Sequence, residues 1–201
     1  MIPEKDSEYL HRMWFEFRKG NKEAFAVFYN LHIDRVYRYG MKICHDESLV
    51  KDTIQEIFLD LYLKRKSNKT TPENLRFYLF LAVKRSLIKK IKYNRRIDRC
   101  EISDKNTSVI DFGVEYQVIK DEKDKERRER VINALNKLSP KQKEVVYLRF
   151  NEGMSYNEIT KILQINIESV RKYIYRALKE LRKELDKQSF MFLLYFFRKN
   201  K

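Results

Sequence analysis

Apolar side chains recur every three or four residues along most of the chain, which is the period of an α-helix with one buried face. Largely apolar pairs mark the clearest helix, at Leu49/Val50, Thr53/Ile54, Ile57/Phe58 and Leu61/Tyr62. Before it, Asn21 is placed to cap one helix and Gly20 to end an earlier one over about residues 8–19. After it, Pro72 suits the first turn of a helix that reaches about residue 94. This pattern predicts an N-terminal helical bundle.

Local signals after residue 125 predict four further helices. A charged helix is followed by two capping boxes, at 139–142 and 155–158, and each box opens a helix. The turn 164–166 then leads to a longer basic helix over about 167–187. A short helix, a tight turn and a longer basic helix together form a helix-turn-helix arrangement. Its turn holds Gln164, so we expect a non-glycine residue in a left-handed or related conformation there.

The fold class is therefore all-α, with an N-terminal helical bundle (8–96) and a C-terminal four-helix helix-turn-helix domain (125–187). Residues 97–124 show no sustained helical period and predict a flexible linker. Residues 188–201 form an apolar and basic tail. Two interpretations of this tail stay open: a helix that packs on its own domain, or an exposed segment that meets a partner such as a protein or a membrane surface.

Composition narrows the function. Only 4 Gly and 3 Pro argue against sandwiches and barrels, which need many turns. A net charge of +15 predicts a polyanionic partner. The sequence has no paired-cysteine motif, secretory signal, membrane-length apolar run, Gly-rich phosphate loop or nucleophile–base motif. We therefore expect a cytoplasmic protein that is not an enzyme and has no metal, cofactor or small-molecule substrate.

Several segments resemble a bacterial RNA polymerase sigma factor of the extracytoplasmic-function type, with only the second and fourth sigma domains of the sigma-70 family. The matching segments are residues 20–25, 52–62, 78–79, 138–140, 155–159 and 170–182. The resemblance implies a transcription initiation factor that binds core RNA polymerase, reads the −35 element as duplex and opens the −10 element. It also implies promoter DNA and an anti-sigma factor as partners, and it suggests that the anti-sigma factor can hold the protein at the membrane. The alternative is a helix-turn-helix regulator that acts without polymerase.

Three groups of residues are the candidate sites. We define the polar patch as Asp52, Gln55 and Glu56; its carboxylates repel phosphate, and the resemblance assigns it to polymerase binding. The −10 candidates lie in the polar loop 66–71 and in a basic stripe on the following helix: Asn68, Thr70 and Thr71, then Arg85, Lys89, Lys92, Arg95 and Arg96. Arg85 stands where the family commonly has Asn.

The −35 candidates are Arg149 and a recognition face on the last predicted helix, consisting of Glu168, Ser169, Arg171, Lys172 and Arg176. Arginine and lysine can bind guanine edges or phosphates in the major groove, and glutamate can accept from cytosine. Arg149 lies outside that helix and is predicted to meet phosphate.

Overall fold

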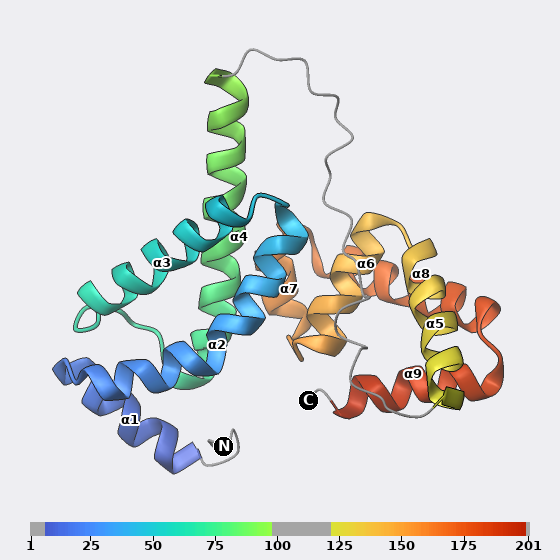
Figure 1. Cartoon of the computed structure of the whole chain (residues 1–201), viewed down its shortest axis with the longest axis horizontal. Helices are drawn as coiled ribbons and strands as arrows, with labels where there is room; N and C mark the ends of the chain where they lie inside the picture. The colour runs from blue at the N-terminus through green and yellow to red at the C-terminus, as the bar shows by residue number, and fades with distance from the viewer. Residues whose placement is uncertain (1–6, 98–121, 200–201) are drawn as a thin grey trace. The chain divides into compact units, whose positions relative to one another are not determined.

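The computed structural model describes residues 7–97 and 122–199, which belong to two compact units, one N-terminal (1–102) and one C-terminal (103–201) (Figure 1). All regular secondary structure in these residues is helical, which confirms the predicted all-α class. Most of the predicted linker lies outside the described residues. Its last residues, from Glu122 onward, are already helical.

Four helices build the N-terminal unit: α1 (Ser7–Lys19), α2 (Lys22–Ile43), α3 (Glu47–Leu63) and α4 (Pro72–Ile97). Asn21 caps α2, as predicted, by accepting a hydrogen bond from the Ala24 N–H at 2.9 Å. α2 packs against each of the other three helices and lies at the centre of the unit. The core is rich in aromatic rings: Phe17, Phe28 and Phe80 are almost fully buried.

The second half of α4 extends beyond the rest of the N-terminal unit (Figure 1). Leu87 is fully buried, whereas Ile88, Lys89, Lys92 and Tyr93 are exposed. The bundle therefore anchors the first half of α4 and leaves the basic second half accessible.

One titratable side chain lies inside the N-terminal core. His32 on α2 is 6% exposed, and its Nδ1 has no hydrogen-bond partner. Its pKa is lowered to about 4, mainly by burial and in smaller part by the nearby cations Arg35 and Arg76. His32 is therefore neutral in the folded unit near neutral pH.

The C-terminal unit contains α5 (Glu122–Lys137), α6 (Pro140–Val146), a π-helical turn η1 (Tyr147–Asn151), α7 (Tyr156–Leu163), α8 (Ile167–Glu184) and α9 (Lys187–Lys199). Both predicted capping boxes are present, Ser139 with Gln142 and Ser155 with Glu158. Gln164 adopts φ 55° and ψ 45°, the predicted left-handed conformation. These local features fix the helix-turn-helix of α7 and α8.

Two features of this unit differ from the expectation. The helix that Ser139 opens leaves α geometry at Tyr147 and continues as the π-helical turn η1. The last predicted helix ends at Glu184, and α9 follows it as a separate fifth helix. Asp186 caps the start of α9 by accepting a hydrogen bond from the Ser189 N–H at 2.7 Å.

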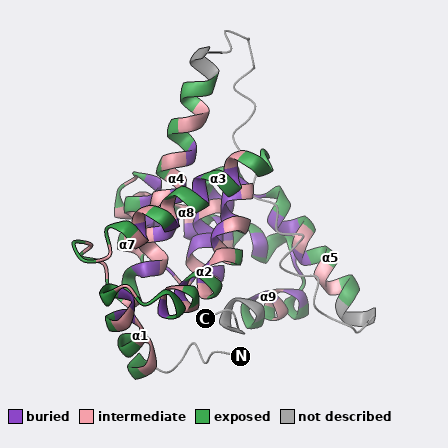
Figure 2. Ribbon diagram, turned by 60° about the vertical axis from the view of Figure 1, so that its left-hand side comes forward, coloured by how far each residue is buried: buried purple, intermediate pink, exposed green. Residues whose placement is uncertain are grey.

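Burial in α8 follows the helical period (Figure 2). Val170, Ile174, Ala177 and Leu181 are buried, as predicted, while Leu178 is only half-buried. Since α8 packs against α6 and α7 through this side, its opposite side remains exposed.

Candidate polymerase and nucleic-acid interfaces

The polar patch lies on the exposed side of α3. Asp52, Gln55 and Glu56 are all exposed. Glu56 forms an ion pair of 2.7 Å with Lys90 on α4, which sequence reasoning missed because the two residues are 34 positions apart. Lys90 offsets the charge of Glu56, so Asp52 carries most of the uncompensated negative charge of the patch.

Two exposed leucines extend the patch along α3. Leu59 is 55% exposed and Leu63 is 65% exposed, and both follow Gln55 at successive intervals of four residues. One side of α3 therefore presents polar and then apolar side chains, the mixture found in protein–protein interfaces. The four-residue spacing was a signal in the sequence, although spacing alone does not separate exposed leucines from core leucines.

Internal hydrogen bonds shape the polar loop. The Asn68 side-chain oxygen accepts from the Thr70 N–H at 2.8 Å, and Thr71 Oγ1 accepts from the Asn74 side chain at 3.2 Å. A hydrogen bond from Thr71 is also the main cause that lowers the pKa of Glu73. Asn68 and Thr71 thus already have structural contacts, and Thr70 is half-buried.

Long-range contacts hold the start of this loop against α1. Arg18 donates to the Lys66 carbonyl at 2.7 Å, and the Tyr62 hydroxyl donates to the Gly20 carbonyl at 3.2 Å. Gly20 has φ +105°, and a Cβ there would lie 3.2 Å from the Arg65 guanidinium. The turn after α1 and the loop after α3 are therefore packed together.

The basic stripe follows the exposed second half of α4. Arg85, Lys89 and Lys92 are exposed, whereas the side chains of Arg95 and Arg96 lie outside the described residues. Tyr93 is 65% exposed among these cations. The stripe can contact a phosphate backbone, and Tyr93 adds an aromatic surface that was not among the predicted site residues.

The recognition face lies at the N-terminal half of α8. Glu168, Arg171, Lys172 and Arg176 are exposed, and Ser169 is half-buried. Asn166 caps the helix by accepting from the Ser169 N–H at 2.7 Å. Since α7 and the turn fix the start of α8, the structure presents these side chains on one rigid surface.

Arg149 has internal contacts that the sequence did not predict. It donates to the Met154 carbonyl at 2.8 Å and lies 5.0 Å from the centre of the Tyr156 ring. Arg149 therefore connects η1 to the start of α7. A phosphate contact would use the N–H groups of Arg149 that remain unbonded to Met154.

Residues 7–97 and 122–199 contain neither a candidate metal site nor a candidate membrane span. In these ranges, no three His, Cys, Asp or Glu side chains gather as a metal site. No helix there is long and apolar enough to cross a bilayer.

Family models match each unit separately. Residues 28–97 match the model described as Sigma-70 region 2, and residues 128–181 match the model described as Sigma-70, region 4. The two matches confirm the resemblance to the sigma-70 family and follow the predicted order of its second and fourth domains. They include the polar patch, the polar loop, the basic stripe and the recognition face.

Similar proteins cover nearly the whole chain. The ECF RNA polymerase sigma factor SigK of Mycobacterium ulcerans is 24% identical over 184 residues, which is 92% of this chain and 97% of that protein. SigK of Mycobacterium tuberculosis (strain H37Rv) is 24% identical over 83% of this chain and 88% of its own length. The solved structure of Bartonella quintana RpoE in complex with the anti-sigma factor NepR has a TM-score of 0.53 and 19% identity, and covers 80% of this chain and 95% of that one.

Proposed function

The chain belongs to the extracytoplasmic-function group of the sigma-70 family, and from this premise we propose how its residues divide the work of transcription initiation. The protein binds core RNA polymerase and directs it to specific promoters. The observation that carries this function is the pair of matches to regions 2 and 4 in one chain. A regulator that acts without polymerase is not favoured, because it would not need the region 2 unit.

The polar patch is the proposed polymerase contact. Asp52 provides an exposed carboxylate that suits a basic helical surface, and Leu59 and Leu63 provide apolar area beside it. The Glu56–Lys90 ion pair joins α3 to α4 between this proposed protein-binding side and the proposed DNA-binding side of α4. Opposite charges at the rim would steer docking, while the leucines would slow dissociation.

The polar loop and the basic stripe are the proposed −10 site. The loop is held in shape by Arg18 and Asn68, so it can receive an unpaired base without first being ordered. Lys89 and Lys92 lie in the second half of α4, away from the loop, and would bind phosphates farther along the DNA. Stacking and hydrogen bonds to an extruded base would offset its unstacking cost of a few kcal/mol.

The recognition face of α8 is the proposed −35 site. Arg171 and Arg176 are exposed on the outer side of the second helix of the helix-turn-helix. This is the element that enters the major groove in such motifs. In this scheme the polymerase performs all covalent chemistry, and the protein itself is not an enzyme.

An anti-sigma factor is the proposed inhibitor. The Bartonella quintana RpoE structure contains the anti-sigma factor NepR, and its fold is similar to the present one. We propose that an anti-sigma factor also binds the present chain and can link it to the membrane. The free protein is then in the cytoplasm.

Run-off transcription tests the proposed function. Core polymerase is incubated with genomic fragments in the presence and absence of the protein, and transcripts are mapped at their 5′ ends. We expect new, discrete start sites only when the protein is present. Duplex binding by the protein alone, with no new transcripts from core, would instead support a regulator independent of polymerase.

A further inference from the structure

Helix α9 lies beyond the region 4 match, which ends at residue 181. It packs on α5, α8 and η1. Leu193 is fully buried and Ser189 is 1% exposed, so one side of α9 completes the core of the C-terminal unit. α9 is therefore a folded part of this unit.

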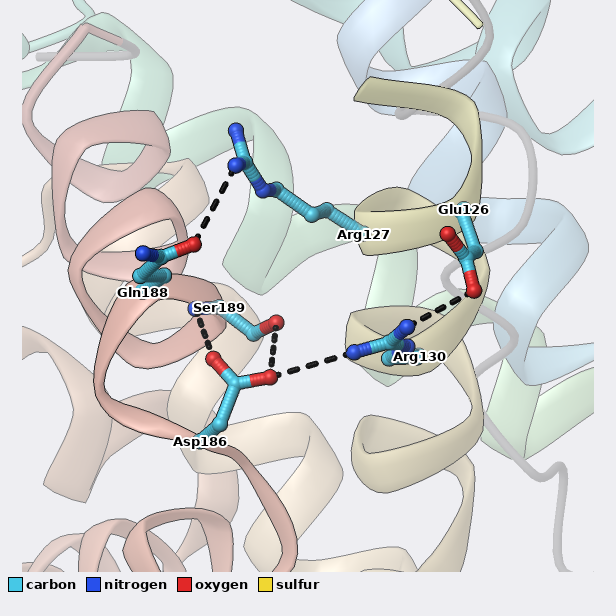
Figure 3. Close-up of polar contacts among 6 residues, drawn as sticks. All are labelled: Glu126, Arg127, Arg130, Asp186, Gln188 and Ser189. Atoms are coloured by element: carbon cyan, nitrogen blue, oxygen red, sulfur yellow. Dashed lines mark hydrogen bonds and ion pairs between the residues drawn. The ribbon is translucent and has the colours of Figure 1, made fainter. Parts of the chain in front are cut away.

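Polar contacts fix the start of α9 against α5 (Figure 3). Asp186 accepts from the Ser189 N–H at 2.7 Å and forms an ion pair of 3.2 Å with Arg130. Arg127 donates to the Gln188 side chain at 3.2 Å. The side of α9 that faces away from the core therefore has a defined orientation.

That outer side is apolar. Met191 is 60% exposed, Leu194 is 38% exposed and Tyr195 is 64% exposed. Their spacing of three and four residues places them on one strip of the helix. A helix with apolar residues on both sides is expected to be covered on both, which indicates a binding surface.

The positive charge of residues 187–201 indicates which kind of partner the strip binds. Residues 187–201 contain four cations, Lys187, Arg198, Lys199 and Lys201, and no aspartate or glutamate. A second copy would bring the same cations together, which disfavours a symmetric dimer through this surface. A sequence that combines apolar and aromatic residues with lysine and arginine is instead typical of helices that lie in the surface of an anionic bilayer.

We propose that the outer strip of α9, formed by Met191, Leu194 and Tyr195, binds an anionic lipid surface. The helix has 13 residues, fewer than the roughly 20 that a membrane span needs, so it lies along the surface. One short apolar strip gives weak and reversible attachment. This activity is separate from promoter recognition.

Vesicle sedimentation of the full-length protein tests the proposal. We expect binding to vesicles of phosphatidylglycerol and phosphatidylcholine, and much weaker binding to phosphatidylcholine alone. The double variant Met191→Ser/Tyr195→Ser should bind the anionic vesicles about tenfold less, because it removes most of the exposed apolar strip. Tyr175→Ser is the matched control, since Tyr175 on α8 is 67% exposed and should not contribute.

A second measurement reports the orientation of the bound protein. Trp14 is the single tryptophan and is 7% exposed. Brominated lipids should therefore quench the variant Tyr195→Trp strongly and Tyr175→Trp little. Equal quenching of the two variants, or unchanged binding by the double serine variant, would mean that general positive charge attracts the protein, and would overturn the proposal.

Two further outcomes also overturn it. One is dimerisation of the protein that the double serine variant abolishes, with no binding to vesicles. The other is capture of an acidic protein partner through this strip without lipid binding. Run-off transcription by the double serine variant should equal that of the unmodified protein, so failure of the lipid proposal leaves the proposed sigma function unaffected.

Discussion

The two regions proposed to bind DNA are held in place by different kinds of contact. In the C-terminal unit, hydrogen bonds between residues three apart fix the ends of α7 and α8, through Ser155, Glu158 and Asn166. In the N-terminal unit, the polar loop has local hydrogen bonds at Asn68 and Thr71, but it is held against α1 by Arg18, which is 48 positions from the carbonyl that it contacts. The proposed duplex-reading surface is thus specified by adjacent sequence, whereas the proposed strand-opening surface also depends on the assembled bundle.

The units also differ in the charge that they expose. The recognition face combines one glutamate with three cations on a single helix. The N-terminal unit places the polar patch of α3 next to the basic stripe of α4, joined by the Glu56–Lys90 pair. This difference fits one task for the C-terminal face and two tasks, binding protein and binding DNA, for the N-terminal unit.

The largest expected effect concerns the protein-binding task. The double change Asp52→Lys/Glu56→Lys should weaken core binding about hundredfold, or ~3 kcal/mol, because it replaces attraction by repulsion. Titration of labelled core polymerase measures the affinity. Glu23→Lys/Asp34→Lys makes the same change in net charge at exposed positions on α2 and should have little effect. Equal affinity losses in both variants would remove the assignment of the patch.

The second effect separates the units by their response to pH. Since the pKa of His32 is lowered to about 4 in the folded unit, the unfolded chain binds more protons between about pH 6.5 and pH 4. Stability is therefore retained above pH 6.5 and lost as pH falls, by about 2 kcal/mol between pH 7 and pH 5. Denaturant unfolding followed by Trp14 fluorescence reports the N-terminal unit. His32→Gln should remove this pH dependence. If the free energy of unfolding of that variant falls equally with pH, His32 is not its source.

The third effect concerns the C-terminal face alone. Arg171→Ala should reduce transcription from a −35-dependent promoter about tenfold, because one arginine–base contact contributes ~1–3 kcal/mol. Lys183→Ala, an exposed cation farther along α8, is the matched control. If Arg171→Ala reduces only strand opening and leaves −35 dependence intact, the recognition face is wrongly assigned.

The smallest expected effect concerns the hydrogen bond from Arg18 to the Lys66 carbonyl. Arg18→Ala should lower the yield of open complexes a few-fold, since losing one hydrogen bond to the loop costs about 1 kcal/mol. Binding to −35 duplex should not change. Lys19→Ala serves as control because Lys19 contacts Glu16 and Phe15 on its own helix. An equal decrease in open complexes with Lys19→Ala would show that the loop does not depend on the Arg18 hydrogen bond.

The sequence predicted those parts of the structure that short-range chemistry determines. The caps at Asn21 and Ser155, the start of α4 at Pro72 and the left-handed Gln164 all follow from residues within a few positions. The Asp186 cap that separates α9 from α8 had a similar local signal, Asp186 followed by Ser189, which the continuous helical period concealed.

The parts that were missed depend on residues distant in sequence or on a small change of helical geometry. The Glu56–Lys90 ion pair and the hydrogen bond from Arg18 to the Lys66 carbonyl form only when the bundle is assembled. Arg149 donates to the Met154 carbonyl from within the π-helical turn η1, although the apolar pattern there does not differ from that of an α-helix. The site residues remain predictions, and the variants above test them.

Permanganate footprinting of promoter DNA tests the central claim most directly, because the reagent oxidises unpaired thymines. The account predicts reactive thymines around the −10 element when core polymerase and the protein are both present, and none with either alone. Strand opening by core alone at the same positions, or no opening with both components at a promoter that the protein selects, would contradict it.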